Sequence, residues 1–249
     1  MRSLAISLVA FALVFGGALL GMYATIPEGR RREEIKDVVR LSSGLIGTMA
    51  ALVLGLLIAS AKSSYDARGT QIKRMTADII LLDDSLAHYG PEAHILRVAL
   101  RDAVPPMINQ IWNERDNGSS APFVPTAEAQ AFVDKIQELK PDTEAKHALQ
   151  AQVLNAIADL GQARLSLFAG AHDSIPMPFL GILIFWLTMI FASFGLFVRA
   201  NSIVVITFFV GALSVAGAFF LILEMDQPLA GLLQISSEPL REALTPLAH

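Results

Sequence analysis

The chain has 249 residues, of which 53% are hydrophobic and 17% charged, and its formal net charge is -4. This composition is too apolar for a soluble domain and too charged for a chain embedded in lipid throughout, so the chain must be divided between membrane and water. A pI near 5.7 argues against nucleic-acid binding, which normally needs a basic surface. The absence of cysteine excludes disulfides, thiolate metal sites and cysteine nucleophiles.

The first apolar segment covers residues 3–27, which carry no charge between Arg2 and Glu28. Its length predicts a membrane helix. A signal peptide is the alternative, but the apolar run is long and residues 22–24 match a small-x-small cleavage site poorly, so we expect the segment to be retained. The following loop, 28–40, carries many charges of both signs, with the positive ones in slight excess. We interpret it as a basic hinge at the membrane interface.

The second segment is the centre of the sequence, because 21 uncharged residues separate Arg40 from Lys62, about the length of a membrane helix. Small residues recur at every fourth position and predict a strip along this helix. Such a strip serves either close packing against another helix or a lumen for water and an ion, where identical helices converge on an axis. The pattern alone favours packing. The strip consists of Ser43, Gly47, Ala51, Gly55, Ala59 and Ser63.

The same helix is expected to continue beyond the membrane, because apolar residues recur there at steps of three and four and predict a buried seam. Residues 89–91, Tyr-Gly-Pro, should end it. The next helix reaches Pro105 and Pro106, where two prolines predict a kink or a break. The seam consists of Ile72, Met75, Ile79, Leu82 and Leu86.

A linker of turn-forming residues, 116–125, precedes two further predicted helices. Thr126 can cap a helix through about Leu139, and Asp142 or Thr143 can cap a longer one that reaches Gly170. The longer helix carries a heptad of Leu149, Val153, Ala156, Leu160, Ala163 and Leu167. With no strand signal, residues 62–173 are predicted to form an extramembrane helical bundle.

Two more uncharged runs, within residues 174–226, predict a membrane hairpin turned at 199–202. The expected fold is therefore all-α: four transmembrane helices, with the helical domain inserted between the second and third. Its segments are 1–61, 62–173, 174–226 and an interfacial tail, 227–249. In the tail, Ser236 or Ser237 should cap a short amphipathic helix near the membrane surface.

Four spans place both termini and the 62–173 domain on one side of the membrane and the 28–40 loop on the other. The distribution of Lys and Arg does not decide the orientation. Six basic residues near the hinge are balanced by six near the termini and just beyond the second span.

Features that carry chemistry are few. The five histidines lack metal-binding spacing, and no phosphate-binding loop or nucleophile elbow is present, so we expect neither an enzyme nor a cofactor. Glu224 and Asp226 lie at the end of the last span, where carboxylates either mark an ion or proton path or bond to the interfacial backbone. In a symmetric oligomer Lys62 and Arg68 would form cationic rings that attract anions, although snorkelling at the interface explains them equally well.

Two short stretches resemble a known family. The run LGLLIASAKSSYDARGTQ resembles the end of the second helix of bestrophins and the segment after it, with Tyr65 and Asp66 in the matching motif. The tail resembles the ending shared by bacterial bestrophin-like proteins, and with the four spans the likeness extends over the whole chain. Ala67 and Arg68 replace the arginine and tryptophan of true bestrophins. The tail positions that match are Glu224, Asp226, Pro228, Ser237, Pro239, Leu240 and Ala243.

The resemblance implies a homo-oligomeric channel for a small inorganic anion in the bacterial inner membrane, with the second span lining the pore and the middle domain in the cytoplasm. The bulky residues of the bestrophin neck would fall near Ala51, Gly55 and Ala59, which are small here. A structural subunit that docks a larger membrane complex is the alternative. A third possibility follows from topology: four spans with a large domain after the second resemble proton-conducting stators of the flagellar and Tol type, in which Glu224 would carry protons.

Overall fold

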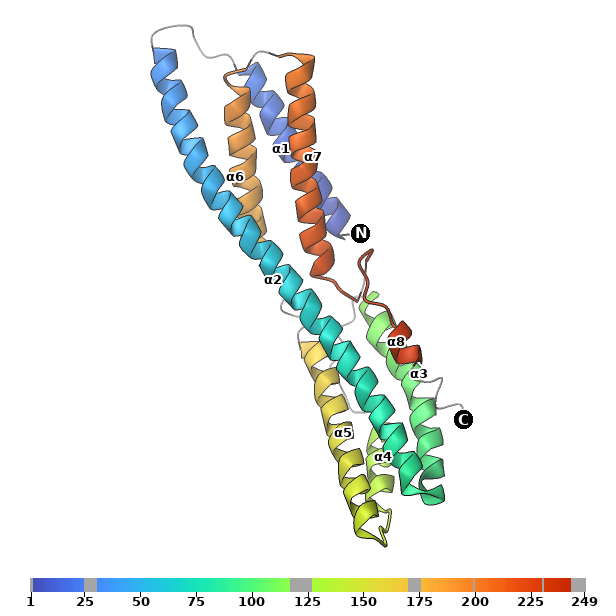
Figure 1. Ribbon diagram of the computed structural model, residues 1–249. Helices are drawn as coiled ribbons and strands as arrows, with labels where there is room; N and C mark the ends of the chain where they lie inside the picture. The colour runs from blue at the N-terminus through green and yellow to red at the C-terminus, as the bar shows by residue number, and fades with distance from the viewer. Residues whose placement is uncertain are drawn as a thin grey trace. The chain divides into compact units, whose positions relative to one another are not determined.

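The computed structural model describes residues 2–24, 31–116, 127–169, 176–198, 200–229 and 231–242. Within these ranges the chain forms helices and no strands, which confirms the all-α prediction (Figure 1). The helices are α1 (Arg2–Tyr23), α2 (Arg31–Tyr89), the short 3₁₀ helix η1 (Pro91–Ala93), α3 (His94–Asp116), α4 (Ala127–Gln137), α5 (Glu144–Ala169), α6 (Met177–Gly195), α7 (Ser202–Met225) and α8 (Glu238–Glu242).

Four of these helices, α1, α2, α6 and α7, are long and apolar enough to cross a membrane. Each is a helix because a backbone inside lipid must bond to itself, and only helices and closed barrels achieve this. The four predicted spans are therefore confirmed by length and composition.

The chain divides into two compact units, each described here by itself. Residues 1–65 and 174–227 form what we call the membrane unit. Residues 66–173 and 228–249 form the helical unit. Helix α2 is continuous and contributes its first part to the membrane unit and its remainder to the helical unit.

Within the membrane unit, α1 lies against both α6 and α7 (Figure 1). Glycines make the approach of α1 to α6 possible: a Cβ added at Gly21 would collide with the carbonyl of Ala192, and one added at Gly195 with the carbonyl of Ala18. Such close backbone contact is the usual role of small residues between membrane helices. Phe209 of α7 completes the contact through edge-to-face packing with two phenylalanines of α1.

Helix α2 joins the membrane unit through a different set of residues. Its Ala50, Leu57 and Ala61 are buried in a cluster with side chains of α6 and α7. Near its start, the hydroxyl of Ser43 lies 2.8 Å from that of Ser193 on α6. One side of α2 is thereby committed to packing within the chain.

The helical unit is built around the predicted seam of α2, whose five apolar residues are 1% exposed or less, as predicted. The heptad of α5 also faces this core, with Val153, Ala156 and Leu167 buried and the others partly buried. Both seam predictions are confirmed.

Of the kink or break predicted at Pro105 and Pro106, the break does not occur, because α3 continues through both prolines. The two prolines are exposed, whereas Val104 and Ile108, on either side of them, are buried in the core of the helical unit. Burial of the flanking side chains outweighs the lost amide donors and holds the helix together.

Helix ends follow the predicted signals where they are described. α2 ends at Tyr89, and Gly90 follows with a φ of 119°, a conformation that other residues rarely adopt. Thr143 caps α5 by accepting a hydrogen bond from the amide of Lys146. The predicted cap at Thr126, and residues 117–125 of the predicted linker, lie outside the described residues.

The tail packs within the helical unit, which the sequence did not predict. Leu229 and Leu240 are buried in its core, and the indole of Trp112 donates to the carbonyl of Ile235 at 3.1 Å. Of the two predicted caps, Ser236 accepts a hydrogen bond from the amide of Glu238, at the start of the five-residue α8.

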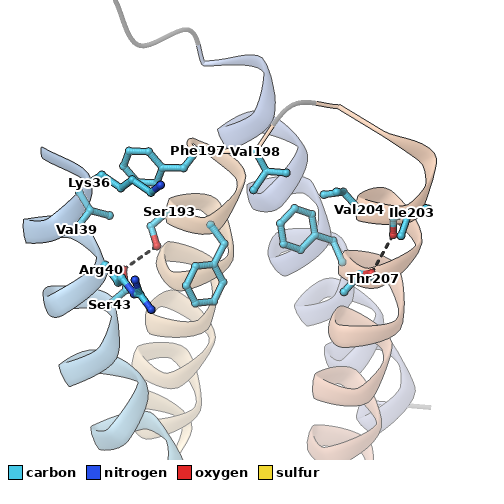
Figure 2. A pocket seen from close by; sticks show the side chains of 12 residues that line it. Lys36, Val39, Arg40, Ser43, Ser193, Phe197, Val198, Ile203, Val204 and Thr207 are labelled. Atoms are coloured by element: carbon cyan, nitrogen blue, oxygen red, sulfur yellow. Dashed lines mark hydrogen bonds between the residues drawn. The ribbon is translucent and has the colours of Figure 1, made fainter. Parts of the chain in front are cut away.

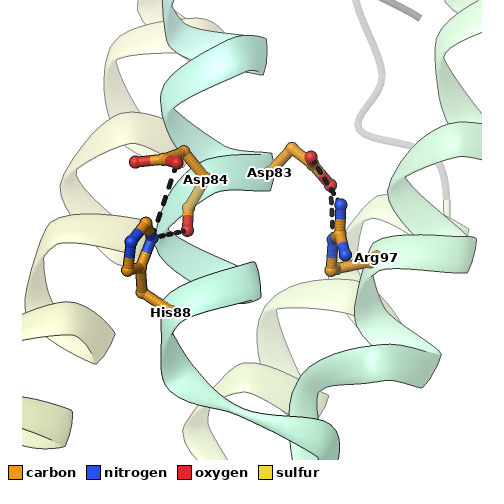
Figure 3. Close-up of polar contacts among 4 residues, drawn as sticks. All are labelled: Asp83, Asp84, His88 and Arg97. Carbon is orange, nitrogen blue, oxygen red and sulfur yellow. Dashed lines mark hydrogen bonds and ion pairs between the residues drawn. The ribbon is translucent and has the colours of Figure 1, made fainter. Parts of the chain in front are cut away.

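A bidentate ion pair ties α2 to α3 (Figure 3). The guanidinium of Arg97 donates to both carboxylate oxygens of Asp83, at 2.7 and 2.8 Å. Hydrogen bonding to Asp83 raises the pKa of Arg97 despite partial burial, so the guanidinium keeps its charge at physiological pH. The adjacent Asp84 instead contacts His88 on the exposed side of α2.

We expect Asp83→Ala to lower the unfolding free energy by about 3 kcal/mol, because it leaves a largely buried guanidinium without its carboxylate. The matched control is Asp84→Ala, which removes an exposed partner and should cost less than about 1 kcal/mol. Thermal unfolding of the purified proteins in detergent measures both. Equal midpoints for the two variants would contradict the structural role of the ion pair.

Exposed face and lateral cavity of the membrane unit

The predicted strip of small residues does not lie on one side of the packed chain. Ser43 is buried, and a Cβ added at Gly47 would lie in van der Waals contact with Ile190 of α6. The later members of the strip are exposed, and a Cβ added at Gly55 would meet nothing within 4 Å. The exposed members are Ala51, Gly55, Ala59 and Ser63.

Helix geometry explains this change along the strip. Four residues advance an α-helix by about 400°, so each step of four turns the side chain by roughly 40° beyond a full circle. Five such steps carry the strip about halfway around α2. Ser43 therefore faces α6, and Ser63 faces away from the other helices of the membrane unit.

A straighter line on the exposed side of α2 is formed by residues seven apart. Thr48, Gly55 and Lys62 are all exposed and stand two turns from one another. Lys62 ends the uncharged stretch, and its ammonium lies 5.8 Å from the centre of the Tyr65 ring, within the range of a cation–π contact. Small, hydroxyl-bearing and cationic side chains thus share one face that the described residues of the membrane unit leave exposed.

The remaining predicted charges differ in exposure. Arg68 is only 8% exposed, unlike Lys62, so the two cations do not form one exposed cluster. Glu224 is buried near the end of α7, and Asp226 caps the same helix in a partly buried position. Asp66, beside the matching Tyr65, is exposed.

A cavity of about 440 Å³ opens between α2, α6 and α7 (Figure 2). Aromatic and aliphatic side chains form most of its wall, among them Phe194, Phe197, Val204 and Phe208. Lys36 and Arg40, one turn apart on α2, line it on one side. Sequence reasoning missed this cavity, because its walls come from segments about 150 residues apart and carry no motif.

The hydroxyl groups in this wall already have partners. Thr207 donates to the carbonyl of Ile203, and Ser193 to that of Ile190. Ser43 and Ser193 are also hydrogen-bonded to each other, and either hydroxyl could be the donor. The cavity therefore offers an apolar wall with two cations, and each of its hydroxyls already has a hydrogen-bond partner.

A second cavity, of about 420 Å³, lies in the helical unit, and most of the residues that line it are polar or charged. It is lined by Asp78, Asp159, Arg74 and two glutamines. Among the residues that the structure describes, no three His, Cys, Asp or Glu side chains gather closely enough to hold a metal ion.

Most of the described tail residues that carry the family resemblance are buried or take part in backbone hydrogen bonds. Pro228 is buried and its carbonyl accepts a hydrogen bond from Ile235, which closes a turn. The carbonyl of Ser237 accepts from Arg241 in α8, Pro239 is exposed in α8, and Leu240 is fully buried. Ala243 lies outside the described residues.

Four apolar helices and a separate helical unit define an integral membrane protein of the all-α class. A family model of the Bestrophin-like domain matches residues 9–240, nearly the whole chain. The chain therefore belongs to the bestrophin-like family. Comparisons with curated proteins and with solved structures found no match.

We expect Leu240→Ala to destabilise the helical unit by about 2–5 kcal/mol, because it leaves a cavity in a packed core. Leu232, three residues after the described Leu229, is 79% exposed and supplies the control, since Leu232→Ala removes little buried surface. Limited proteolysis and thermal unfolding in detergent would reveal the difference. If both variants melt together, the tail does not stabilise the unit.

Proposed function

We propose that the chain assembles into a homo-oligomeric channel for small inorganic anions, with the exposed face of α2 lining the pore. The observation that carries the proposal is the exposure of small residues on α2 around Gly55, where an added Cβ would meet no described residue within 4 Å. Membership in the bestrophin-like family supports the same assignment. The proposal needs neither catalysis nor a cofactor.

The contrast between glycines strengthens this argument. Gly21 and Gly195 are required inside the chain, because a side chain at either would collide with a neighbouring backbone. Gly55 has no such role, yet glycine in a helix interior costs about 0.8–1 kcal/mol relative to alanine. A lumen, or a second helix brought by another copy, gives the absence of a side chain there a purpose.

Lys62 is the cation that we assign to the pore mouth. It is exposed, stands two turns from Gly55 on the same side of α2, and is held near the Tyr65 ring. In a symmetric oligomer its copies form a positive ring, which raises the local concentration of anions. The burial of Arg68 leaves Lys62 as the exposed one of the two predicted cations.

The family resemblance supports a bacterial inner membrane as the location, with the helical unit in the cytoplasm. A structural subunit that docks a membrane complex is the alternative function. The same exposed face favours it, because small residues also permit close contact with a partner helix.

Gly55→Leu separates these two functions. For a lumen, we expect an intact oligomer in detergent and largely abolished anion flux in liposomes, because leucine narrows and dewets the pore. Gly217→Leu is the matched control: this glycine lies in α7, is exposed, and has equal space around it, so flux should persist. Dissociation of the Gly55→Leu oligomer would instead assign the face to helix packing.

Lys62→Gln should lower chloride flux by about tenfold without changing oligomer size, because it removes the focusing charge. Lys62→Arg should restore the flux, and Lys73→Gln, which removes another exposed cation of α2, should leave it unchanged. Planar-bilayer recordings of the purified protein measure the conductance and the anion-to-cation permeability ratio. Unaltered selectivity in Lys62→Gln would refute the assigned role.

A further inference from the structure

The lateral cavity between α2, α6 and α7 has a composition that suits an amphipathic anion. Its wall is apolar, its hydroxyls are engaged, and its charged groups are Lys36 and Arg40 (Figure 2). Its volume of about 440 Å³ falls within the usual range for binding sites of small organic ligands. Any polar group of a ligand that lay against the apolar wall, away from Lys36 and Arg40, would lose its water without gaining a hydrogen-bond partner.

The position of the cavity along the uncharged stretch of α2 indicates how deep in the bilayer its cations and its apolar wall lie. Arg40 directly precedes the uncharged residues 41–61, and Lys36 lies one turn, about 6 Å, before it. The cations therefore stand where a membrane helix passes from hydrocarbon to headgroups. The apolar wall reaches Phe208, seven residues into α7 from Asn201, the residue that caps its start.

Charge complementarity then selects the ligand. Two cations one turn apart on the same side of a helix match a phosphate, to which guanidinium can donate two parallel hydrogen bonds. Both side chains are exposed, and among the described residues neither makes an ion pair with a carboxylate. Basic pockets between membrane helices are suited to anionic lipid headgroups.

We propose that this cavity binds one anionic phospholipid of the surrounding bilayer. The phosphate lies between Lys36 and Arg40, and an acyl chain occupies the space lined by Phe194, Phe197 and Phe208. The chain thereby acquires a lipid as a component of its membrane unit. This proposal does not depend on ion conduction and is tested without any measurement of flux.

The test uses the full chain, purified and delipidated in detergent, and two phospholipids with identical acyl chains, phosphatidylglycerol and phosphatidylcholine. Native mass spectrometry counts the bound lipid and thermal unfolding measures the stabilisation. We expect one phosphatidylglycerol per chain, bound at least about tenfold more tightly than phosphatidylcholine, because each cation favours an anionic headgroup. Equal affinity for both lipids would overturn the proposal.

Two variants locate the site. The double variant Lys36→Gln with Arg40→Gln should lose the preference for phosphatidylglycerol, whereas Lys73→Gln with Arg101→Gln, which removes two exposed cations elsewhere, should keep it. Thr207→Phe fills the cavity and should lower the affinity for both lipids. Its control is Ser214→Phe, on the same helix, whose hydroxyl also bonds to the carbonyl four residues back but does not line the cavity.

Each remaining outcome is also decisive. If Thr207→Phe and Ser214→Phe bind phosphatidylglycerol equally well, the acyl chain does not enter this cavity and the proposal fails. If Thr207→Phe alters oligomer size while the wild-type chain shows no lipid preference, a second copy covers the cavity instead, which also overturns it. Should Thr207→Phe not fold, Val204→Trp, from the same wall, provides the same occlusion.

Discussion

A backbone amide in lipid has no water to bond, and the hydrogen-bond ladder of α2, which continues for 59 residues, meets this constraint in the uncharged stretch 41–61. No proline occurs between Arg31 and Tyr89, and the first strong terminator is Gly90, followed by Pro91. Since the backbone of α2 is uniform, its side chains alone must distinguish the part in the membrane unit from the part in the helical unit. Small and aliphatic residues serve the first, and the regular apolar seam serves the second.

Small residues in the membrane unit illustrate how one sequence signal supports different contacts. Around Gly21 and Gly195 they bring two helices of one chain together until their backbones touch. Around Gly55 they leave open space, and near Ser43 they allow a hydroxyl pair between α2 and α6. The identity of the residue records only that bulk is absent. The direction in which the residue points decides what fills the space.

Regular patterns were predictable because their cause is local. The seam from Ile72 to Leu86 and the cap at Thr143 follow from helix periodicity and from backbone groups at helix ends, and both are confirmed. Whether α3 would break at Pro105 or continue through it could not be decided from the sequence, since the outcome depends on distant side chains that bury Val104 and Ile108. The small residues on the exposed face of α2 could be recognised in the sequence. Their rotation around the helix was overlooked, because a spacing of four does not coincide with 3.6 residues per turn.

The lateral cavity and the tail were missed for a common reason: each joins segments far apart in the chain. Lys36 and Thr207 line the same cavity, and Trp112 donates a hydrogen bond to the carbonyl of Ile235. In neither pair does the sequence around one residue indicate that the other lies beside it. The opposite holds for Asp83 and Arg97, which are 14 residues apart and pair across the α2–α3 turn, so a search for opposite charges near that turn could have found them.

The burial of Leu229 and Leu240 has a consequence for biosynthesis. A nascent chain leaves the ribosome from its N-terminus to its C-terminus, and domains ordinarily fold as units while synthesis continues. Here α2, α3, α4 and α5 are all made before α6 and α7, but the core that they share lacks two of its side chains until residues 229–240 emerge. The helical unit therefore completes its core only after the last membrane helix has been translated. Until that moment the apolar side chains that Leu229 and Leu240 cover in the finished core remain exposed.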